Sequence, residues 1–190
     1  FYHNALQGQQ GEFARDYLQQ RGLDKTIIDQ YQVGLAPGTG TALYDSASKD
    51  IQGPLIETGT VSDRYGRPRD LFRNRIMFPI RNSRGRTIAF GGRTLGDDKA
   101  KYINSPESDV FHKSREIYGL FEAKQALRQV DRLLVVEGYM DVIALAQNGI
   151  HFAVATLGTA TNQDSLSALL RQARHIIFCF DGDSAGFRAA

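Results

Sequence analysis

Residues 131–190 alternate between short apolar runs and helix-like segments, and this alternation limits the possible fold more than any other feature. The runs LLVV, FAVAT and HIIFCF are continuously apolar, as expected for strands of a parallel sheet that is covered by helices on both faces. The segments between them, MDVIALAQNG and QDSLSALLRQA, have helical patterns. The sequence therefore predicts a βαβαβ unit, after which SAGFRAA opens another helix.

Carboxylates follow two of these predicted strands. Glu137 comes directly after LLVV, Asp141 lies four residues later, and Asp181 and Asp183 follow HIIFCF. Side chains just past the carboxyl ends of parallel strands meet at one edge of the sheet. Their mutual repulsion is unfavourable unless a cation lies among them, and an all-oxygen ligand set favours Mg²⁺ or Mn²⁺ over zinc.

A purely structural interpretation of these acids stays open. Asp183 could cap the following helix, FDGDSAG is a good turn sequence, and Glu137 could be an exposed strand end. The joint placement of the acids at two strand ends favours the metal site. Magnesium commonly completes its coordination shell with phosphate oxygens, so this interpretation also implies a phosphate-bearing substrate.

The first half of the chain has a mixed α and β pattern. Two short helices are predicted within residues 1–37, EFARDYLQQ and KTIIDQY, with Gly22 ending the first and Asp24 capping the second. Residues 38–59 read as mixed helix and loop. The runs IMFPI and TIAFGG predict a hairpin, in which Pro79 indicates an edge or an irregularity. A further helix is expected from about Leu120.

Positive charge is concentrated around this predicted hairpin. Residues 64–115 contain 13 Lys and Arg against 5 Asp and Glu, a net charge of +8 in a chain of net charge +2. This density favours a polyanion such as nucleic acid or a nucleoside triphosphate, although about half of these side chains could be ordinary solvated surface. In FGGR the paired glycines would allow close approach to a ligand, and KYIN combines a cation, a ring and an amide.

Composition restricts the remaining possibilities. The single cysteine, Cys179, lies in an apolar run and is expected to be a buried filler; it excludes an internal disulfide and a cysteine-rich zinc site. No apolar run approaches the ~20 residues that span a bilayer, and no signal peptide is evident. We therefore expect a cytoplasmic protein. Because the chain starts at Phe1 and stops early in a predicted helix, we expect it to be part of a longer protein.

Four segments together resemble a known family: VVEGYMDV, FDGD, RNRIMFPIRNSRGRTIAFGGR and KYINSPESDVFHKS. They are similar to the RNA polymerase core of the bacterial replicative DNA primases, the DnaG type. The resemblance covers nearly the whole chain, and its most specific part runs from Arg73 to Asp183. Glu137 and FDGD alone would indicate only the wider Toprim fold, which type IA and type II topoisomerases and several nucleases share.

The resemblance implies roles for individual residues. Glu137, Asp181 and Asp183 match the metal-binding acids of the Toprim centre, with Asp141 a further acidic position beside them. The positions matching those implicated in nucleotide or template binding are Arg21, Arg73, Arg93, Lys101 and Lys113, with Tyr102 and Asn104 in the same patch. The implied cofactor is Mg²⁺, for which Mn²⁺ can substitute.

The resemblance also implies a domain organisation. It predicts an α/β chain with a basic, mixed α+β subdomain at residues 1–115 and an incomplete Toprim subdomain at residues 116–190. The family's later aspartate pair, its preceding zinc-binding module and its C-terminal region that docks on the replicative helicase are outside this sequence. The expected partners are a single-stranded DNA template, ribonucleoside triphosphates and that helicase, with no membrane.

The implied reaction is nucleotidyl transfer that synthesises RNA primers. A Toprim nuclease or topoisomerase would share the acids but does not predict FGGR and KYINSP. FDGDS is also similar to the aspartate phosphatases of the haloacid dehalogenase type, but those carry DxD on their first strand. A nucleic-acid-binding domain with purely structural acids is the non-enzymatic alternative.

Overall fold

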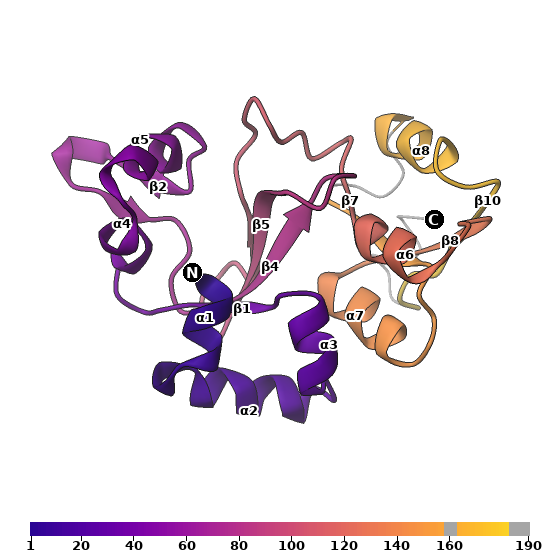
Figure 1. Cartoon of the computed structure of the whole chain (residues 1–190), viewed down its shortest axis with the longest axis horizontal. Helices are drawn as coiled ribbons and strands as arrows, with labels where there is room; N and C mark the ends of the chain where they lie inside the picture. The colour runs from indigo at the N-terminus through magenta and orange to yellow at the C-terminus, as the bar shows by residue number, and fades with distance from the viewer. Residues whose placement is uncertain (158–162, 183–190) are drawn as a thin grey trace. The chain divides into compact units, whose positions relative to one another are not determined.

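The computed structural model describes residues 1–157 and 163–182 (Figure 1). Its contacts divide the chain into two units. Unit 1 comprises Phe1–Pro79 and Ala89–Phe111, and unit 2 comprises Ile80–Ile88 and His112–Ala190. The middle of the predicted hairpin therefore groups with unit 2, although the sequence suggests a single boundary after residue 115.

Unit 1 begins with short helices. Asp24 caps one of them as predicted, because its side chain accepts a hydrogen bond from the Ile27 N–H, and Gly22 has the left-handed φ of +81° that suits a helix end. The sequence predicts two helices before residue 38, and the structure has a third, α1, ahead of them. The helices are α1 Tyr2–Gln7, α2 Glu12–Gln20, α3 Lys25–Gln30, α4 Ala42–Ser46 and α5 Lys49–Glu57, with 3-10 turns η1 Gln9–Gly11 and η2 Arg64–Gly66.

A four-stranded sheet of order β1-β4-β5-β6 supports these helices. Its strands are β1 Gly34–Ala36, β4 Arg75–Arg81, β5 Thr87–Thr94 and β6 Tyr102–Asn104, and a small separate pair is formed by β2 Val61–Ser62 and β3 Arg69–Asp70. β4 and β5 form the predicted hairpin through the turn at Asn82, whose N–H donates to the Arg86 carbonyl. The pairing of β1 with β4 ends at Met77, so Pro79 lies where β4 has lost that neighbour, as Pro requires.

An aromatic cluster fills the core of unit 1. The rings of Tyr2, Phe72 and Phe90 meet edge to face, with centroid separations of 5.1 to 6.5 Å. Gly34 allows this packing, because a Cβ there would lie 2.6 Å from Tyr2. Phe13 is 65% exposed, and Ala14 and Leu18 make the buried face of α2.

Unit 2 contains the predicted βαβαβ arrangement. Its sheet has the order β10-β8-β9-β7, in which β8 pairs in parallel with β9 and β10, and the short β7, absent from our prediction, pairs antiparallel with β9. The strands are β7 Ile117–Tyr118, β8 Arg132–Val136, β9 Ala153–Thr156 and β10 His175–Phe178; the helices are α6 Leu120–Ala126, α7 Tyr139–Gln147 and α8 Gln163–Leu170. The further helix predicted at SAGFRAA lies outside the described residues.

β10 departs from the expected burial. Ile177 and Phe178 are 44% and 39% exposed, and Cys179, predicted to be buried, is exposed as well. The strand is the outermost in the described sheet, so it has a neighbour, β8, on one side only. An apolar run at the edge of a sheet resembles a central strand in sequence but does not have its burial.

A buried ion pair holds the hairpin tip in unit 2. Arg81 Nη1 lies 3.1 Å from Glu122 Oε1, and the two side chains are 9% and 5% exposed. Burial raises the pKa of Glu122, and the Arg81 charge opposes that shift. Gly85 turns the tip with a φ of +76°, and a Cβ there would lie 2.6 Å from Phe121. These contacts explain why Ile80–Ile88 groups with unit 2 rather than unit 1.

Candidate functional site

The carboxyl ends of β8 and β10 bring two of the predicted acids together. Glu137 directly follows β8, and Asp181 lies just beyond β10, the parallel neighbour of β8. The Asp181 N–H donates to Glu137 Oε1 at 2.8 Å. Both residues are exposed to solvent. The predicted meeting of these strand ends is therefore confirmed, and the hydrogen bond orients the Glu137 carboxylate.

Asp141 lies beside this edge, in the first turn of α7. Its Oδ2 is so close to the N-cap residue Gly138 that a Cβ added there would lie 2.9 Å from it. We call Glu137, Asp141 and Asp181 the acidic edge. Asp183, the remaining predicted acid, lies outside the described residues, and within residues 1–157 and 163–182 no three acidic, histidine or cysteine side chains are grouped closely enough to hold a metal ion. The oxygen ligands that are present suit a hard cation.

In unit 1 a second group of predicted residues comes together around two tyrosines. Arg93 is only 8% exposed, and its guanidinium carbon lies 5.5 Å from the ring centroids of both Tyr17 and Tyr102. Arg93 Nη1 also donates to the Tyr102 hydroxyl at 2.9 Å. Arg21, at the end of α2, lies 5.4 Å from the same Tyr17 ring. Tyr17 is thus a shared surface for two cations, an arrangement that favours planar guanidinium groups.

Tyr17, Arg21, Arg93 and Lys101 line an open cavity of about 460 Å³, and Tyr102 contacts Arg93 beside it. We call Tyr17, Arg21, Arg93, Lys101 and Tyr102 the tyrosine–arginine pocket. Two acids, Asp97 and Asp98, also line the cavity. Its lining therefore carries both positive and negative charges.

Arg75 fixes the loop that carries those acids. Its Nη2 lies 3.0 Å from Asp98 Oδ2, and its Nη1 donates to the carbonyls of Gly92, Ala100 and Lys101. Burial lowers the pKa of Arg75, and the Asp98 carboxylate opposes that shift. Arg75 is therefore a structural arginine, and it places Lys101 at the cavity.

Arg73, Asn104 and Lys113 are not among the residues that line this cavity. Arg73 is exposed and precedes β4, because Asn74, with a φ of +51°, interrupts the extended backbone before the strand begins at Arg75. Asn104 ends β6, opposite Gly91. Lys113 belongs to unit 2. Arg73 lines a different cavity, with Arg64, Arg67 and Arg69.

Gly92 in FGGR is required by internal packing, whereas the predicted close approach of a ligand to these glycines stays a prediction. A Cβ at that position would lie 2.7 Å from the Phe72 ring and 3.2 Å from Arg75 Cδ. The glycine therefore makes room for internal packing beneath the pocket.

Sequence reasoning missed Tyr17 as a member of the pocket. The i, i+4 spacing between Tyr17 and Arg21 was a usable signal, since such pairs are neighbours on a helix. The contact with Arg93, 76 residues later in the sequence, carries no local signal.

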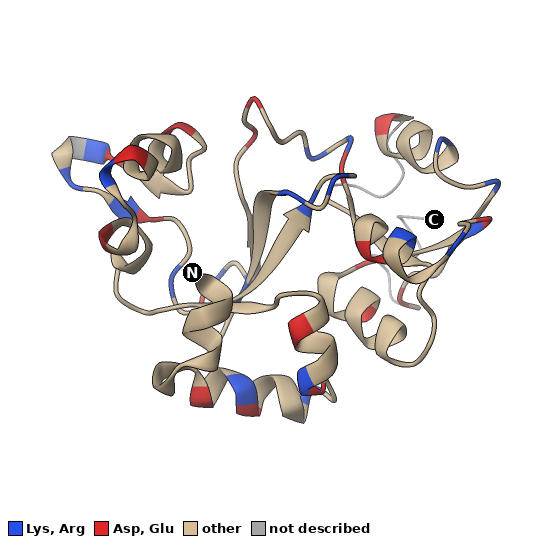
Figure 2. Cartoon of the chain, in the orientation of Figure 1, with Lys and Arg blue, Asp and Glu red and all other residues tan. Residues whose placement is uncertain are grey.

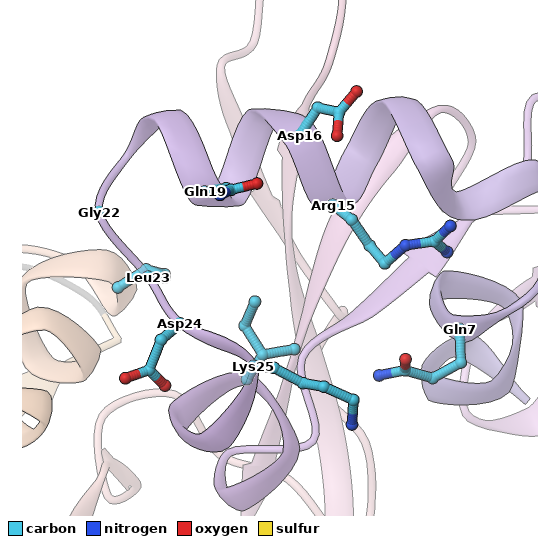
Figure 3. A pocket seen from close by; sticks show the side chains of 9 residues that line it. Gln7, Arg15, Asp16, Gln19, Gly22, Leu23, Asp24 and Lys25 are labelled. Atoms are coloured by element: carbon cyan, nitrogen blue, oxygen red, sulfur yellow. The ribbon is translucent and has the colours of Figure 1, made fainter.

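A further cavity, of about 750 Å³, lies among α1, α2 and α3 (Figure 3). Its charged lining is engaged internally. Arg15 donates to the carbonyls of Leu6 and Gly8, and Lys25 pairs with Asp29. None of the predicted site residues lines it. We therefore interpret this cavity as a result of helix packing rather than as a functional site.

The parallel sheet and its acidic edge define a Toprim-type protein, and comparison with protein families agrees: residues 131–190 match the family described as the Toprim domain. Residues 1–124 match the family described as the N-terminal domain of the DNA primase catalytic core. The chain therefore belongs to the DNA primase catalytic core family. The match over the first 124 residues argues against a separate Toprim nuclease or topoisomerase.

Curated relatives are similar along the whole chain. It is 51% identical to the DNA primase of Salmonella typhimurium and 51% identical to that of Pseudomonas aeruginosa, with 100% of this chain covered in each case. It covers 33% and 29% of those two proteins, so the chain spans about a third of the length of the relatives it matches.

Solved structures of the same family have the same fold. A DNA primase domain from Pseudomonas aeruginosa matches with a TM-score of 0.94 at 49% identity, and the E. coli primase catalytic core with 0.91 at 48%. Both matches cover 100% of this chain and about 60% of the solved chain. A DnaG primase catalytic domain bound to single-stranded DNA matches with a TM-score of 0.91 at 48% identity, again over the whole of this chain and 60% of that one.

Proposed function

We propose that this chain is the part of a DNA-dependent RNA polymerase that synthesises short RNA primers on single-stranded DNA. One observation carries the proposal: a Toprim sheet with Glu137 and Asp181 joined at its edge follows a primase-type basic unit in the same chain. The related catalytic domain bound to single-stranded DNA supports such a template. The reaction is nucleotidyl transfer, in which a ribonucleotide 3′-hydroxyl attacks the α-phosphate of the next triphosphate and pyrophosphate leaves.

The acidic edge is the proposed site of the divalent metal that a Toprim domain implies. Glu137, Asp181 and Asp183 are the proposed ligands, with Asp141 beside them, and their oxygen atoms suit Mg²⁺ or, in its place, Mn²⁺. The bound ion would lower the pKa of the attacking hydroxyl and neutralise charge on the transferred phosphate. The Asp181 N–H keeps the Glu137 carboxylate turned toward the neighbouring strand end.

The basic residues are proposed to hold the phosphates. Arg21, Arg93 and Lys101 provide cations around one cavity, and planar guanidinium groups bind phosphate through paired hydrogen bonds. Their fixed positions would supply orientation, which contributes several kcal/mol to such reactions. Tyr102 offers a ring that is 37% exposed, suitable for stacking on a base. Arg73, Asn104 and Lys113 are proposed as further contacts to nucleotide or template.

Within the described ranges, 1–157 and 163–182, no helix is long and apolar enough to cross a membrane. We propose that the protein acts in the cytoplasm, with ribonucleoside triphosphates as substrates and the replicative helicase as a partner of a region beyond this sequence.

Replacing Glu137 with Gln in the whole protein tests the proposal. The amide oxygen can still accept the Asp181 N–H, so the fold should be kept, while the metal loses an anionic ligand. We expect primer synthesis to fall by more than about 100-fold, since several kcal/mol of charge stabilisation are lost. Binding of a single-stranded oligonucleotide should stay within about twofold.

The matched control is Glu57→Gln, which removes an exposed carboxylate at the end of α5 in unit 1 and should leave primer synthesis unchanged. Primer synthesis that persists in the Glu137→Gln protein would reject the assignment of this carboxylate to catalysis. Equal loss of synthesis and of oligonucleotide binding would show that Glu137 is structural.

A further inference from the structure

Two acids line the cavity that is proposed to hold phosphates, although electrostatics disfavours them there. Asp97 and Asp98 share this cavity with Arg21, Arg93 and Lys101. Figure 2 shows that acidic positions lie among the basic ones on the ribbon of unit 1. A carboxylate repels a phosphate that binds near it. Each of the two acids should therefore weaken anion binding, unless it has a second role that outweighs the repulsion.

Asp98 holds the β5–β6 loop, residues 95–101, in place. Its Oδ2 accepts a hydrogen bond from Arg75 Nη2 at 3.0 Å and another from the Thr94 hydroxyl at 2.9 Å. The Thr94 hydroxyl oxygen in turn accepts the Gly96 N–H at 3.1 Å. One carboxylate oxygen therefore connects the end of β5, the first residues of the loop and a buried arginine of β4.

Arg75 extends this network to Lys101. Arg75 Nη1 donates to the Ala100 carbonyl at 3.1 Å and to the Lys101 carbonyl at 3.4 Å. The backbone N–H of Thr94 donates to the same Lys101 carbonyl at 2.9 Å. Donors on two strands, β4 and β5, therefore fix the backbone of Lys101, while its side chain is exposed and lines the cavity.

The charge of Asp98 keeps Arg75 in this position. Within residues 1–157 and 163–182, Asp98 provides the only carboxylate that pairs with Arg75. The other partners of the guanidinium in that part of the chain are neutral carbonyl groups. A buried cation without an anion is strongly disfavoured, so removal of Asp98 favours a position of Arg75 closer to water. The Lys101 carbonyl then loses one of its donors.

Asp97 provides the comparison, because it lines the same cavity without these contacts. It is exposed, and its side chain forms no ion pair or hydrogen bond with the residues that the structure describes. Asp97 and Asp98 therefore bring the same charge to the same cavity, but the network that fixes Lys101 includes Asp98 and not Asp97. Charge and positioning can thus be separated experimentally.

We propose that Asp98, acting through Arg75, is a positioning residue for Lys101, and that triphosphate binding depends on Asp98 in spite of its negative charge. The inference rests on the proposed function, in which Lys101 holds the phosphates of a ribonucleoside triphosphate. Lysine has a flexible four-carbon stem, so a fixed backbone reduces the freedom that is lost when its ammonium group meets phosphate. In this role Asp98 needs no contact with substrate or metal.

The first test compares Asp98→Ala with its matched control Asp97→Ala in the whole protein, with ATP affinity measured by calorimetry. Asp98 is changed rather than Arg75, because its side chain is 56% exposed and Arg75 is buried. We expect Asp97→Ala to bind ATP about 1.5- to 5-fold more tightly, the effect of removing one exposed charge. Asp98→Ala should bind ATP about 10-fold more weakly. If Asp98→Ala also binds ATP more tightly, charge is its whole contribution and the inference is overturned.

Steady-state kinetics separate positioning from a general loss of structure. In primer synthesis, Asp98→Ala should raise the KM for ribonucleoside triphosphates about 10-fold and leave kcat within about twofold, because only binding of the substrate is weakened. A lower kcat at unchanged KM would show a smaller fraction of folded enzyme, and the inference would be wrong.

A double-mutant cycle tests whether Asp98 acts through Lys101. The Asp98→Ala, Lys101→Ala double variant should bind ATP within about twofold of Lys101→Ala alone, because the side chain that Asp98 positions is already absent. Losses that add, by a further factor of about 10, overturn the inference and leave the proposed function standing. If Lys101→Ala alone binds ATP as the unmodified protein does, the proposed role of Lys101 fails, and the inference fails with it.

Discussion

The tyrosine–arginine pocket and the acidic edge hold their charged groups in opposite ways. Arg93 is 8% exposed and lies against two tyrosine rings, whereas Glu137 and Asp181 are exposed at the ends of their strands. The Arg93 guanidinium contacts two rings and donates to the Tyr102 hydroxyl, whereas the Glu137 carboxylate accepts one backbone N–H.

This difference follows from what each group is expected to bind. A flat guanidinium binds phosphate best when its plane is fixed beforehand, since less freedom is lost on binding. Ligands of Mg²⁺ need room for water and for substrate oxygens, because this ion keeps several waters. A basic pocket with a buried guanidinium and an exposed acidic edge are therefore both suited to their proposed roles.

Gly92→Ala should have the largest effect of the changes that test this contrast in rigidity. The new Cβ would lie 2.7 Å from the Phe72 ring, which is 1% exposed and cannot move aside easily. Overpacking of this kind costs about 1–3 kcal/mol. Urea unfolding should show a free energy of unfolding lower by that amount.

The control for this change is Gly38→Ala, where a Cβ meets nothing within 4 Å; its unfolding free energy should stay within about 0.5 kcal/mol. If Gly92→Ala lowered the free energy of unfolding no more than Gly38→Ala, the residues packed beneath the pocket could adjust to an added methyl group. The contrast in rigidity with the acidic edge would then disappear.

Tyr17→Leu should have the next largest effect, on binding rather than on folding. It removes the ring that Arg21 and Arg93 share, and cation–π contacts contribute about 0.5–2 kcal/mol. We expect the affinity for a ribonucleoside triphosphate, measured by calorimetry, to fall by about 3- to 30-fold.

Tyr17→Phe is the matched control. It keeps the ring and removes a buried hydroxyl that has no hydrogen-bond partner among the described residues, so affinity should stay close to that of the unmodified protein. If Phe and Leu weakened binding equally, the hydroxyl rather than the ring would position the arginines.

The contrast also shows which parts of the molecule can be predicted from sequence. The βαβαβ order followed from the hydrophobic pattern of the sequence. The meeting of Glu137 with Asp181 followed from the topology of a parallel sheet, because parallel strands place their carboxyl ends at one edge. The tyrosine–arginine pocket was predicted only in part. Its cations were identified through family resemblance, but the contact between Tyr17 and Arg93 depends on tertiary packing that no local pattern encodes.

Burial was the other point at which sequence reasoning failed. The run around Cys179 reads as a central strand, yet it is the outermost strand of the described sheet. Conversely, Arg81 and Glu122 read as ordinary surface charges and form a buried ion pair. Strand order and long-range pairing decide both cases, and neither follows from composition.

Gly138→Ala should have the smallest effect on the free energy of unfolding. It tests the acidic edge, the exposed site in this comparison. The new Cβ would lie 2.9 Å from Asp141 Oδ2, the far end of an exposed side chain rather than backbone. The φ of Gly138 is −135°, which alanine adopts without strain. The free energy of unfolding should fall by only about 0.5 kcal/mol, from the weaker helix N-cap.

The informative measurement for Gly138→Ala is manganese affinity, followed by calorimetry. If Asp141 helps to hold the ion, its displaced carboxylate should weaken binding several-fold at nearly unchanged stability. A loss of stability as large as that expected for Gly92→Ala would show that Asp141 is held firmly, and the acidic edge would then be as rigid as the tyrosine–arginine pocket. Unchanged stability with unchanged manganese affinity would instead place Asp141 outside the metal site, because moving its carboxylate would then have no consequence for the ion.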